Sequence, residues 1–254
     1  MRQFDDKTVS VIIPVYNAEK HLRQMLDSIL SQTYEKVEIV MVDDRSSDSS
    51  AEIIAEYRER CPNIVYHLQE KNMGAGHARN KALELARGRY AAFLDSDDIW
   101  LPEKLERQLA LMEETGTPFC YAAIEMIDEN GKLLKPKRNI REQCDYNYLL
   151  HNTIIATSSV VIDREKLGDF RVHLRRGGQD YATWLRLLRG GVVARGINDV
   201  LVRYRVSSGS LSSNKFDSIR QVWEIQTRDE GIGKLSAFFH VCCFAFNALK
   251  KYLI

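Results

Sequence analysis

The first 117 residues alternate short apolar runs with amphipathic segments, and this order constrains the fold more than any other feature of the chain. The apolar runs are rich in Val and Ile and end in polar residues, as buried strands do; they lie at residues 9–16, 37–44, 63–68 and 90–94. The amphipathic segments predict helices over residues 18–33, 46–61, 76–87 and 102–115. Repeated strand–helix–strand units predict an α/β fold whose mostly parallel sheet has helices on both faces.

Local signals support these helices. The apolar residues of the first one recur at helical spacing and share a face: Leu22, Met25, Leu26, Ile29 and Leu30. Ser and Asp residues precede the second helix and can cap it. We expect Pro102 at the first helical position of the fourth helix, where proline is favoured.

After residue 118 the order changes and predicts a smaller mixed sheet with helices. Strands are expected over residues 119–128, 153–163 and 192–206, with a hairpin turn at Asn130-Gly131 and a glycine-terminated helix over 180–191. We therefore expect one domain over residues 1–215, with halves 1–117 and 118–215, and a helical segment over 216–254.

Charge and cysteine content exclude some function classes. A formal charge of +1 leaves no basic excess to neutralise phosphates, which argues against a dedicated nucleic-acid binder. The five cysteines are odd in number and form no C-x-x-C pair, which argues against a disulfide framework or a zinc ribbon. A reducing cytoplasm is the expected compartment.

The C-terminal stretch, residues 234–254, is apolar and ends in a basic pair. It is dense in Phe, Leu, Val and Cys, and Lys250 and Lys251 follow. One interpretation is a helix packed on its own domain or on a partner subunit. A second is a helix lying in the headgroup region at the cytoplasmic face of a membrane, with the lysines favouring anionic lipid. A third is a membrane-spanning helix.

Polar clusters follow three of the predicted strands: Tyr16-Asn17, Asp43-Asp44-Arg45 and Asp95 to Asp98. Because the carboxyl ends of parallel strands meet at one edge of a sheet, we expect these clusters to converge, and ligands of such sheets bind there.

The stretch "YAAFLDSDDIW" (90–100) runs from apolar residues into three carboxylates, which repel one another and are costly to desolvate. Asp-x-Asp at a strand end can hold Mg²⁺ or Mn²⁺ through carboxylate oxygens. The alternative is a solvated turn that caps the next helix. We expect Asp98 to serve only as the start of that helix.

The glycines in "NMGAGHARN" (72–80) do not form a dinucleotide fingerprint, because Arg79 occupies the third glycine position and the segment follows the third strand. We expect a turn into a helix, with Arg79 near a phosphate. Asp180 begins another predicted helix behind a glycine pair. It can act as a helix cap or as a general base.

Five motifs occur in the order typical of family 2 glycosyltransferases, and residues 8–210 resemble that family. They are SVIIPVYN, VDDRSSD, N-x-G-x-G-x-A-R-N, FLDSDD and QDYATWLRL. The resemblance implies a GT-A fold and an inverting transfer from a nucleotide-diphosphate sugar, with UDP as the expected nucleotide. It also implies a saccharide or lipid-linked saccharide acceptor, used in cell-surface polysaccharide synthesis, and Mn²⁺ or Mg²⁺ as cofactor.

The resemblance also implies roles for single residues. Pro14 and Tyr16 would line the nucleotide base, and Asp44 would hydrogen-bond it. Arg79 would hold the nucleotide end of the site, and Asp95 would approach the ribose or the metal. The remaining two carboxylates would act on the metal and on the acceptor: Asp97 as metal ligand and Asp180 as catalytic base.

Two positions depart from the family pattern. The usual Glu-Asp pair reads Gln179-Asp180, so the base has lost a charged neighbour. Ser207 and Ser208 stand where many relatives carry a histidine that adds a metal ligand. Two rival functions stay open: an inactive nucleotide-sugar or glycan-binding protein of the same fold, and a nucleotidyltransferase.

Overall fold

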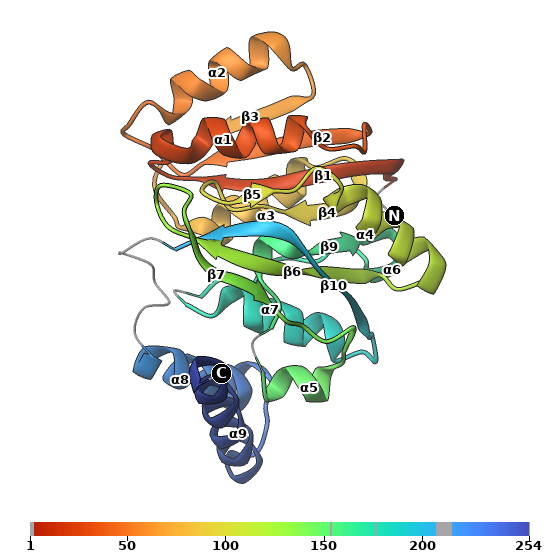
Figure 1. The fold of residues 1–254 in the computed structure, drawn as a ribbon, viewed down its shortest axis with the longest axis vertical. Helices are drawn as coiled ribbons and strands as arrows, with labels where there is room; N and C mark the ends of the chain where they lie inside the picture. The colour runs from red at the N-terminus through yellow and green to blue at the C-terminus, as the bar shows by residue number, and fades with distance from the viewer. Residues whose placement is uncertain (1–2, 153, 176, 207–214, 254) are drawn as a thin grey trace.

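The computed structural model describes residues 3–152, 154–175, 177–206 and 215–253, and it has an α/β fold built on one ten-stranded sheet (Figure 1). The strand order is β3-β2-β1-β4-β9-β6-β10-β5, with β7 paired to β6 and β8 to β10. The strands are β1 Asp5–Val15, β2 Val37–Asp43, β3 Ile64–Leu68, β4 Gly88–Phe93, β5 Ile99–Trp100, β6 Phe119–Ile127, β7 Leu133–Arg138, β8 Gln143–Cys144, β9 Val161–Asp163 and β10 Ala194–Arg205.

The helices confirm most of the predicted order. They are α1 Glu19–Leu30, α2 Ser50–Arg60, α3 Ala75–Leu85, α4 Lys104–Thr115, α5 Tyr146–Leu150, α6 Arg164–Leu167, α7 Gln179–Leu188, α8 Lys215–Glu224 and α9 Lys234–Leu253, with a 3₁₀ turn at Thr157–Ser159 and a π-turn at Ile225–Asp229.

Helices cover both faces of the sheet, as predicted. Side chains of β1 alternate between two cores: Ile12 enters one, and Val11 and Ile13 enter the other. The Val11 core includes residues of α1, α2 and α4, whereas the Ile12 core includes residues of α3, α5, α7, α8 and α9. The alternation along one strand therefore builds a three-layer domain.

The strands of the second half extend the same sheet instead of forming one of their own. β9 pairs antiparallel with both β4 and β6, and β10 runs parallel to β6. The hairpin from β6 to β7 turns at Gly131, as the sequence predicts. Because β9 joins the two halves, polar residues of both can meet at one edge.

Two sequence predictions are wrong in detail. The strand expected over 153–163 is only Val161–Asp163; Thr153 lies outside the described residues, and a 3₁₀ turn occupies Thr157–Ser159. Hydroxyl groups there compete with strand pairing, since Ser159 Oγ donates to the Ala156 carbonyl at 2.7 Å.

The fourth predicted helix starts later than expected. Glu103 is its N-cap, so Pro102 precedes the helix and does not occupy its first position. The reason is the short strand β5: the Leu101 N–H still donates to Leu201 across the sheet, which delays the helical turn.

The C-terminal segment packs through one face only. Val222, Ile225 and Phe244 are buried in the core beside α7, and α8 and α9 lie together at one end of the molecule (Figure 1). The other face of α9 exposes Leu235, Phe238, Phe239 and Phe246. Among the helices of the described chain, none has both the length and the apolar content needed to cross a membrane.

Candidate active site

The sheet opens at the carboxyl end of β1. Pairing of β1 with β4 ends at Ile12–Phe93, whereas pairing with β2 continues to Val15–Asp43. Pro14 lies two residues beyond Ile12, so its missing N–H faces the side that β4 has left, where proline costs no ladder hydrogen bond. Strand order reverses direction here, from β3-β2-β1 to β4, and such switch points are the ligand crevices of α/β sheets.

Two turns with left-handed backbone border this crevice. Asn17 has φ 48° and Arg45 has φ 69°, a region that is costly for residues other than glycine. Side chains tie the turns together: the Asn17 N–H donates to Ser46 Oγ at 3.0 Å, and Asn17 Oδ1 accepts from the Ser47 N–H at 2.8 Å. Tyr16, which precedes Asn17, is 54% exposed and can meet a ligand.

Asp44 organises the loop that leads into α3. Its buried carboxylate accepts from Gln69 Nε2 at 2.6 Å, from the Met73 N–H at 2.7 Å and from the Gly74 N–H at 2.6 Å. Gly74 has φ 91°, which only glycine adopts readily. A carboxylate has about four acceptor positions, and donors from within the chain occupy three of those of Asp44.

The three carboxylates after β4 have three different environments. Asp95 pairs with Arg79 at 2.5 Å. Asp98 is 1% exposed and accepts from Ser158 Oγ at 2.5 Å and from the Arg205 N–H at 2.8 Å. The expectation that Asp98 only starts the next helix is therefore wrong: the helix begins at Lys104, and Asp98 is a buried junction between β10 and the 3₁₀ turn.

Asp97 is the carboxylate left open. Within the described residues, no side chain or other residue's N–H donates to it, and it is only partly buried. Burial, together with the charge of Asp95, raises the pKa of Asp97 to about 6. Burial raises the pKa of Asp98 well above its ordinary value, and the charge of Asp97 adds to this.

A divalent ion fits this arrangement only with help from a ligand. No group of three or more His, Cys, Asp or Glu side chains in the described chain could enclose a metal. Mg²⁺ and Mn²⁺ are commonly held by one or two carboxylates, with water and phosphate oxygens completing the shell. Asp97, with Asp95 nearby, suits that mode.

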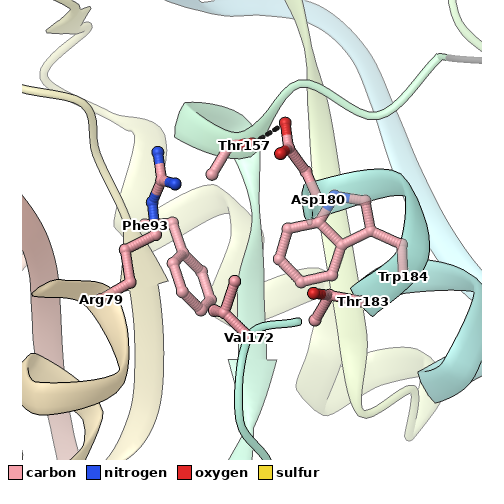
Figure 2. A pocket seen from close by; sticks show the side chains of 7 residues that line it. All are labelled: Arg79, Phe93, Thr157, Val172, Asp180, Thr183 and Trp184. Atoms are coloured by element: carbon pink, nitrogen blue, oxygen red, sulfur yellow. Dashed lines mark hydrogen bonds between the residues drawn. The ribbon is translucent and has the colours of Figure 1, made fainter. Parts of the chain in front are cut away.

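Arg79 and Asp180 form opposite walls of a small pocket, with Thr157 between them (Figure 2). Thr157 Oγ1 donates to Asp180 Oδ2 at 2.7 Å. Burial alone would lower the pKa of Arg79, but the charges of Asp95 and Asp180 more than offset it, and the pKa is raised. The structure therefore brings together three of the predicted residues: Arg79, Asp95 and Asp180.

Gln179, the first residue of α7, lies beside this pocket. Its Oε1 is 3.5 Å from Arg79 Nη1, and a Cβ placed on Gly76 would approach its amide to 3.1 Å. The neutral amide of Gln179 packs against α3 and places no second charge beside Asp180.

Three residues of the site were not predicted. Thr157 orients Asp180. Arg205 is 3% exposed, and its Nε donates to the Asp97 carbonyl at 2.8 Å. Burial raises the pKa of Tyr204, and four carboxylates add to the shift, so this phenol lies among the acids. In the sequence, Tyr204 and Arg205 stand shortly before Ser207, the position where many relatives carry a histidine, and this is the only hint that they belong to the site. Ser207 and Ser208 themselves lie outside the described residues.

Sequence comparisons identify close relatives. A family model described as "Glycosyl transferase family 2" matches residues 10–175. The putative teichuronic acid biosynthesis glycosyltransferase TuaG of Bacillus subtilis is 39% identical over 96% of this chain and 97% of its own. The Escherichia coli β-1,3-glucosyltransferase WfgD, named for UDP-Glc and α-D-GlcNAc-diphosphoundecaprenol, is 38% identical over 87% of this chain and 86% of its own.

Solved structures share the fold. Staphylococcus aureus TarS (residues 1–349) in complex with UDP-GlcNAc superposes with a TM-score of 0.72 at 21% identity, over 94% of this chain and 71% of that one. The mannosyltransferase PcManGT of Pyrobaculum calidifontis, in complex with GDP-Man and Mn²⁺, gives a TM-score of 0.69 at 20% identity, over 95% of this chain and 73% of that one.

Proposed function

Because this chain belongs to glycosyl transferase family 2, we propose that it transfers a sugar from a UDP-sugar to a hydroxyl group of a lipid-linked saccharide, with inversion at the anomeric carbon. The observation that carries the proposal is that the carboxylates at the carboxyl ends of the strands form two separate groups. Asp97 is left open beside Asp95, and Asp180 faces Arg79 across the pocket (Figure 2). Donor and acceptor groups would thus meet two separate carboxylates.

The nucleotide would lie along the ends of β1 and β2. Tyr16 is exposed there and would offer its ring to the base, Pro14 would form the floor, and the remaining acceptor position of Asp44 would take a base N–H. The strained turns at Asn17 and Arg45 are held by Ser46 and Ser47, so this surface is rigid before a ligand arrives.

The diphosphate would lie between Arg79 and Asp97. Arg79 carries a fixed positive charge and points into the pocket. Asp97, with Asp95 and the donor's phosphate oxygens, would hold Mn²⁺ or Mg²⁺, which supplies charge neutralisation for the leaving diphosphate.

Asp180 would act as general base. Its Oδ2 accepts from Thr157, which fixes the orientation of the carboxylate and leaves Oδ1 to take the proton of the acceptor hydroxyl. The oxygen would attack the anomeric carbon from the face opposite the diphosphate, which gives inversion. Gln179 contributes no charge, so Arg79 is the charged group that faces Asp180 across the pocket, and Thr157 is its hydrogen-bond donor.

The names of the relatives support a lipid-linked acceptor, and the exposed aromatic residues of α9 support contact with a membrane surface. WfgD is named for a diphosphoundecaprenol-linked GlcNAc acceptor, and TuaG for teichuronic acid biosynthesis. The exposed Phe238, Phe239 and Phe246 on α9, with Lys250 and Lys251 beyond them in the sequence, suit insertion into an anionic headgroup layer.

A thermal-shift screen tests the donor class. UDP-, GDP- and dTDP-sugars are compared with and without Mn²⁺. We expect the largest rise in Tm with a UDP-sugar plus Mn²⁺, because ligands that bind only the folded state stabilise it. A shift with UDP-sugars that is equal with and without Mn²⁺, or a preference for another nucleotide, would contradict the proposal.

A further inference from the structure

We propose that α8 and the π-turn Ile225–Asp229 belong to the active site, because they position the helix end that carries Asp180. This inference rests on the proposed role of Asp180 as base. The family model ends at residue 175, so both the base and this segment lie beyond the matched region. Contacts of three independent kinds join the segment to residues 175–181.

The first contact is steric. Gly177 and Gly178 precede α7, and a Cβ on Gly177 would overlap the side-chain amide of Gln221 in α8. A Cβ on Gly178 would lie 2.8 Å from Ile225 Cδ1, and Gly178 also has φ 67°. The glycine pair therefore lets α8 approach the turn before Asp180 more closely than any side chain would allow.

The second contact is ionic. Arg175 Nη1 donates to Asp229 Oδ2 at 2.6 Å, and Arg175 Nη2 lies 3.3 Å from Glu224 Oε2; all three side chains are largely buried. The carbonyl of Arg175 in turn accepts from Gln179 Nε2. One arginine thus links the π-turn to the first residue of α7.

The third contact holds Tyr181, the residue after the base. Its hydroxyl accepts from Gln226 Nε2 at 3.0 Å and donates to the Leu150 carbonyl at 3.2 Å. Its ring lies 6.2 Å from that of Phe244 in α9, centroid to centroid. Gln226 is fully buried, and π-helical turns, which are rare, are frequently found at functional sites.

Together these contacts fix both residues that flank Asp180, whereas Thr157 is the sheet-side partner of the base itself. A general base must be placed within hydrogen-bond distance of its proton, and a displacement of about 1 Å can cost on the order of a hundredfold in rate. Asp180 is the catalytic residue here, and Gly177, Gln221 and Arg175 are positioning residues.

The test is Gly177→Val in the whole 254-residue chain, with Gly190→Val as matched control. A Cβ on Gly190 would have no atom of the described residues within 4 Å, so valine there meets only open space. Three quantities are measured: the Kd for UDP-glucose with Mn²⁺, the rate of UDP release from UDP-glucose to water, and deuterium exchange of the α7 amides.

We expect Gly177→Val to lower kcat for UDP release by roughly 10- to 100-fold, with the Kd for UDP-glucose changed by no more than about twofold. Exchange of the α7 amides should rise. Gly177→Val/Gln221→Ala, which removes the overlapping amide, should recover most of the rate and the protection. Gly190→Val should behave as wild type.

Unchanged kcat and unchanged exchange in Gly177→Val would overturn the inference, as would a loss that Gln221→Ala does not restore. A wild-type protein that binds no UDP-sugar contradicts the proposed function instead; the exchange measurement then still decides whether α8 holds α7.

Discussion

Three carboxylates follow β4 within four residues, and each side chain meets a different partner. Asp95 is neutralised by Arg79, and Asp98 is buried with hydrogen bonds from Ser158 and Arg205. Asp97 alone lacks a donor from another residue of the described chain. Partners within the chain thus offset the charge of Asp95 and Asp98, whereas Asp97 can still accept a cation that arrives with a ligand.

Because the Asp97 carboxylate has no partner within the described chain, Asp97→Ala tests whether it holds the metal. We expect the variant to lose Mn²⁺ binding in the presence of UDP, because Asp95 alone would be left to hold the ion and shares its carboxylate with Arg79. Electron paramagnetic resonance of free Mn²⁺, titrated with protein and UDP, measures this directly. Glu103→Ala, a change at an exposed carboxylate before α4, serves as control, and equal Mn²⁺ binding by Asp97→Ala and the control would refute the assignment.

A second residue-scale prediction concerns Lys104. It is fully buried, its Nζ lies 4.0 Å from the Trp100 ring centroid, and burial lowers its pKa to about 7. The unfolded chain keeps this proton up to about pH 10, whereas the folded chain loses it above about pH 7. Since the unfolded state then binds more protons, the free energy of unfolding should rise with pH.

Urea denaturation between about pH 7.5 and 8.5 measures this slope, expected at up to about 1.4 kcal/mol per pH unit. Lys104→Met should be more stable than wild type at the lower pH and lose the slope. Lys36→Met, at an exposed lysine, should keep it. A slope that survives in Lys104→Met would assign the pH dependence to another group.

At the scale of elements, the sequence predicts regular segments well and their junctions poorly. The Val/Ile runs and the helical stripe of α1 follow from periodicity alone, and these elements are confirmed, except that Leu30 of the predicted stripe is exposed at the end of the helix. The 3₁₀ turn at Thr157–Ser159 could not be predicted, because its hydroxyl groups bond Asp98 and Asp180, which are far away in sequence. The pairing of Arg79 with Asp95 likewise depends on how α3 packs against β1 and β2.

Asp98 joins β10 to the 3₁₀ turn, so its substitution tests this junction. Asp98→Ala leaves the Ser158 hydroxyl and the Arg205 N–H buried without an acceptor and should cost about 2–4 kcal/mol. Asp98→Asn keeps one acceptor and no charge, and its cost should be clearly smaller. Denaturant unfolding at neutral pH compares the two; equal losses would contradict a hydrogen-bonding role.

At the scale of the molecule, the candidate catalytic groups lie at the carboxyl ends of the strands, whereas α9, which carries the exposed aromatic residues, lies at one end of the fold (Figure 1). The segments between them, α8 and the π-turn, pack against α7. Under the proposed function, a lipid-linked acceptor would enter from a membrane surface that α9 would contact. The family resemblance predicted the catalytic groups, whereas the packing of α8 on α7 needed the structure.

Co-sedimentation with vesicles tests the role of α9. Wild type should bind vesicles that contain phosphatidylglycerol more strongly than those of phosphatidylcholine alone. Phe238→Ser/Phe239→Ser should weaken binding by at least about tenfold, since each Phe contributes about 1.5–3 kcal/mol on burial. The control is Leu133→Ser/Leu134→Ser on the exposed strand β7, and an equal loss in that control would contradict a specific role for α9.

Asp180→Asn tests the central claim most directly. Transfer from the UDP-sugar that wild type uses is measured alongside the Kd of the same donor with Mn²⁺. The amide retains the hydrogen bond from Thr157 and cannot accept a proton, so transfer should fall by about 10²- to 10⁴-fold while the donor Kd stays within about threefold. Undiminished transfer by Asp180→Asn would contradict the account.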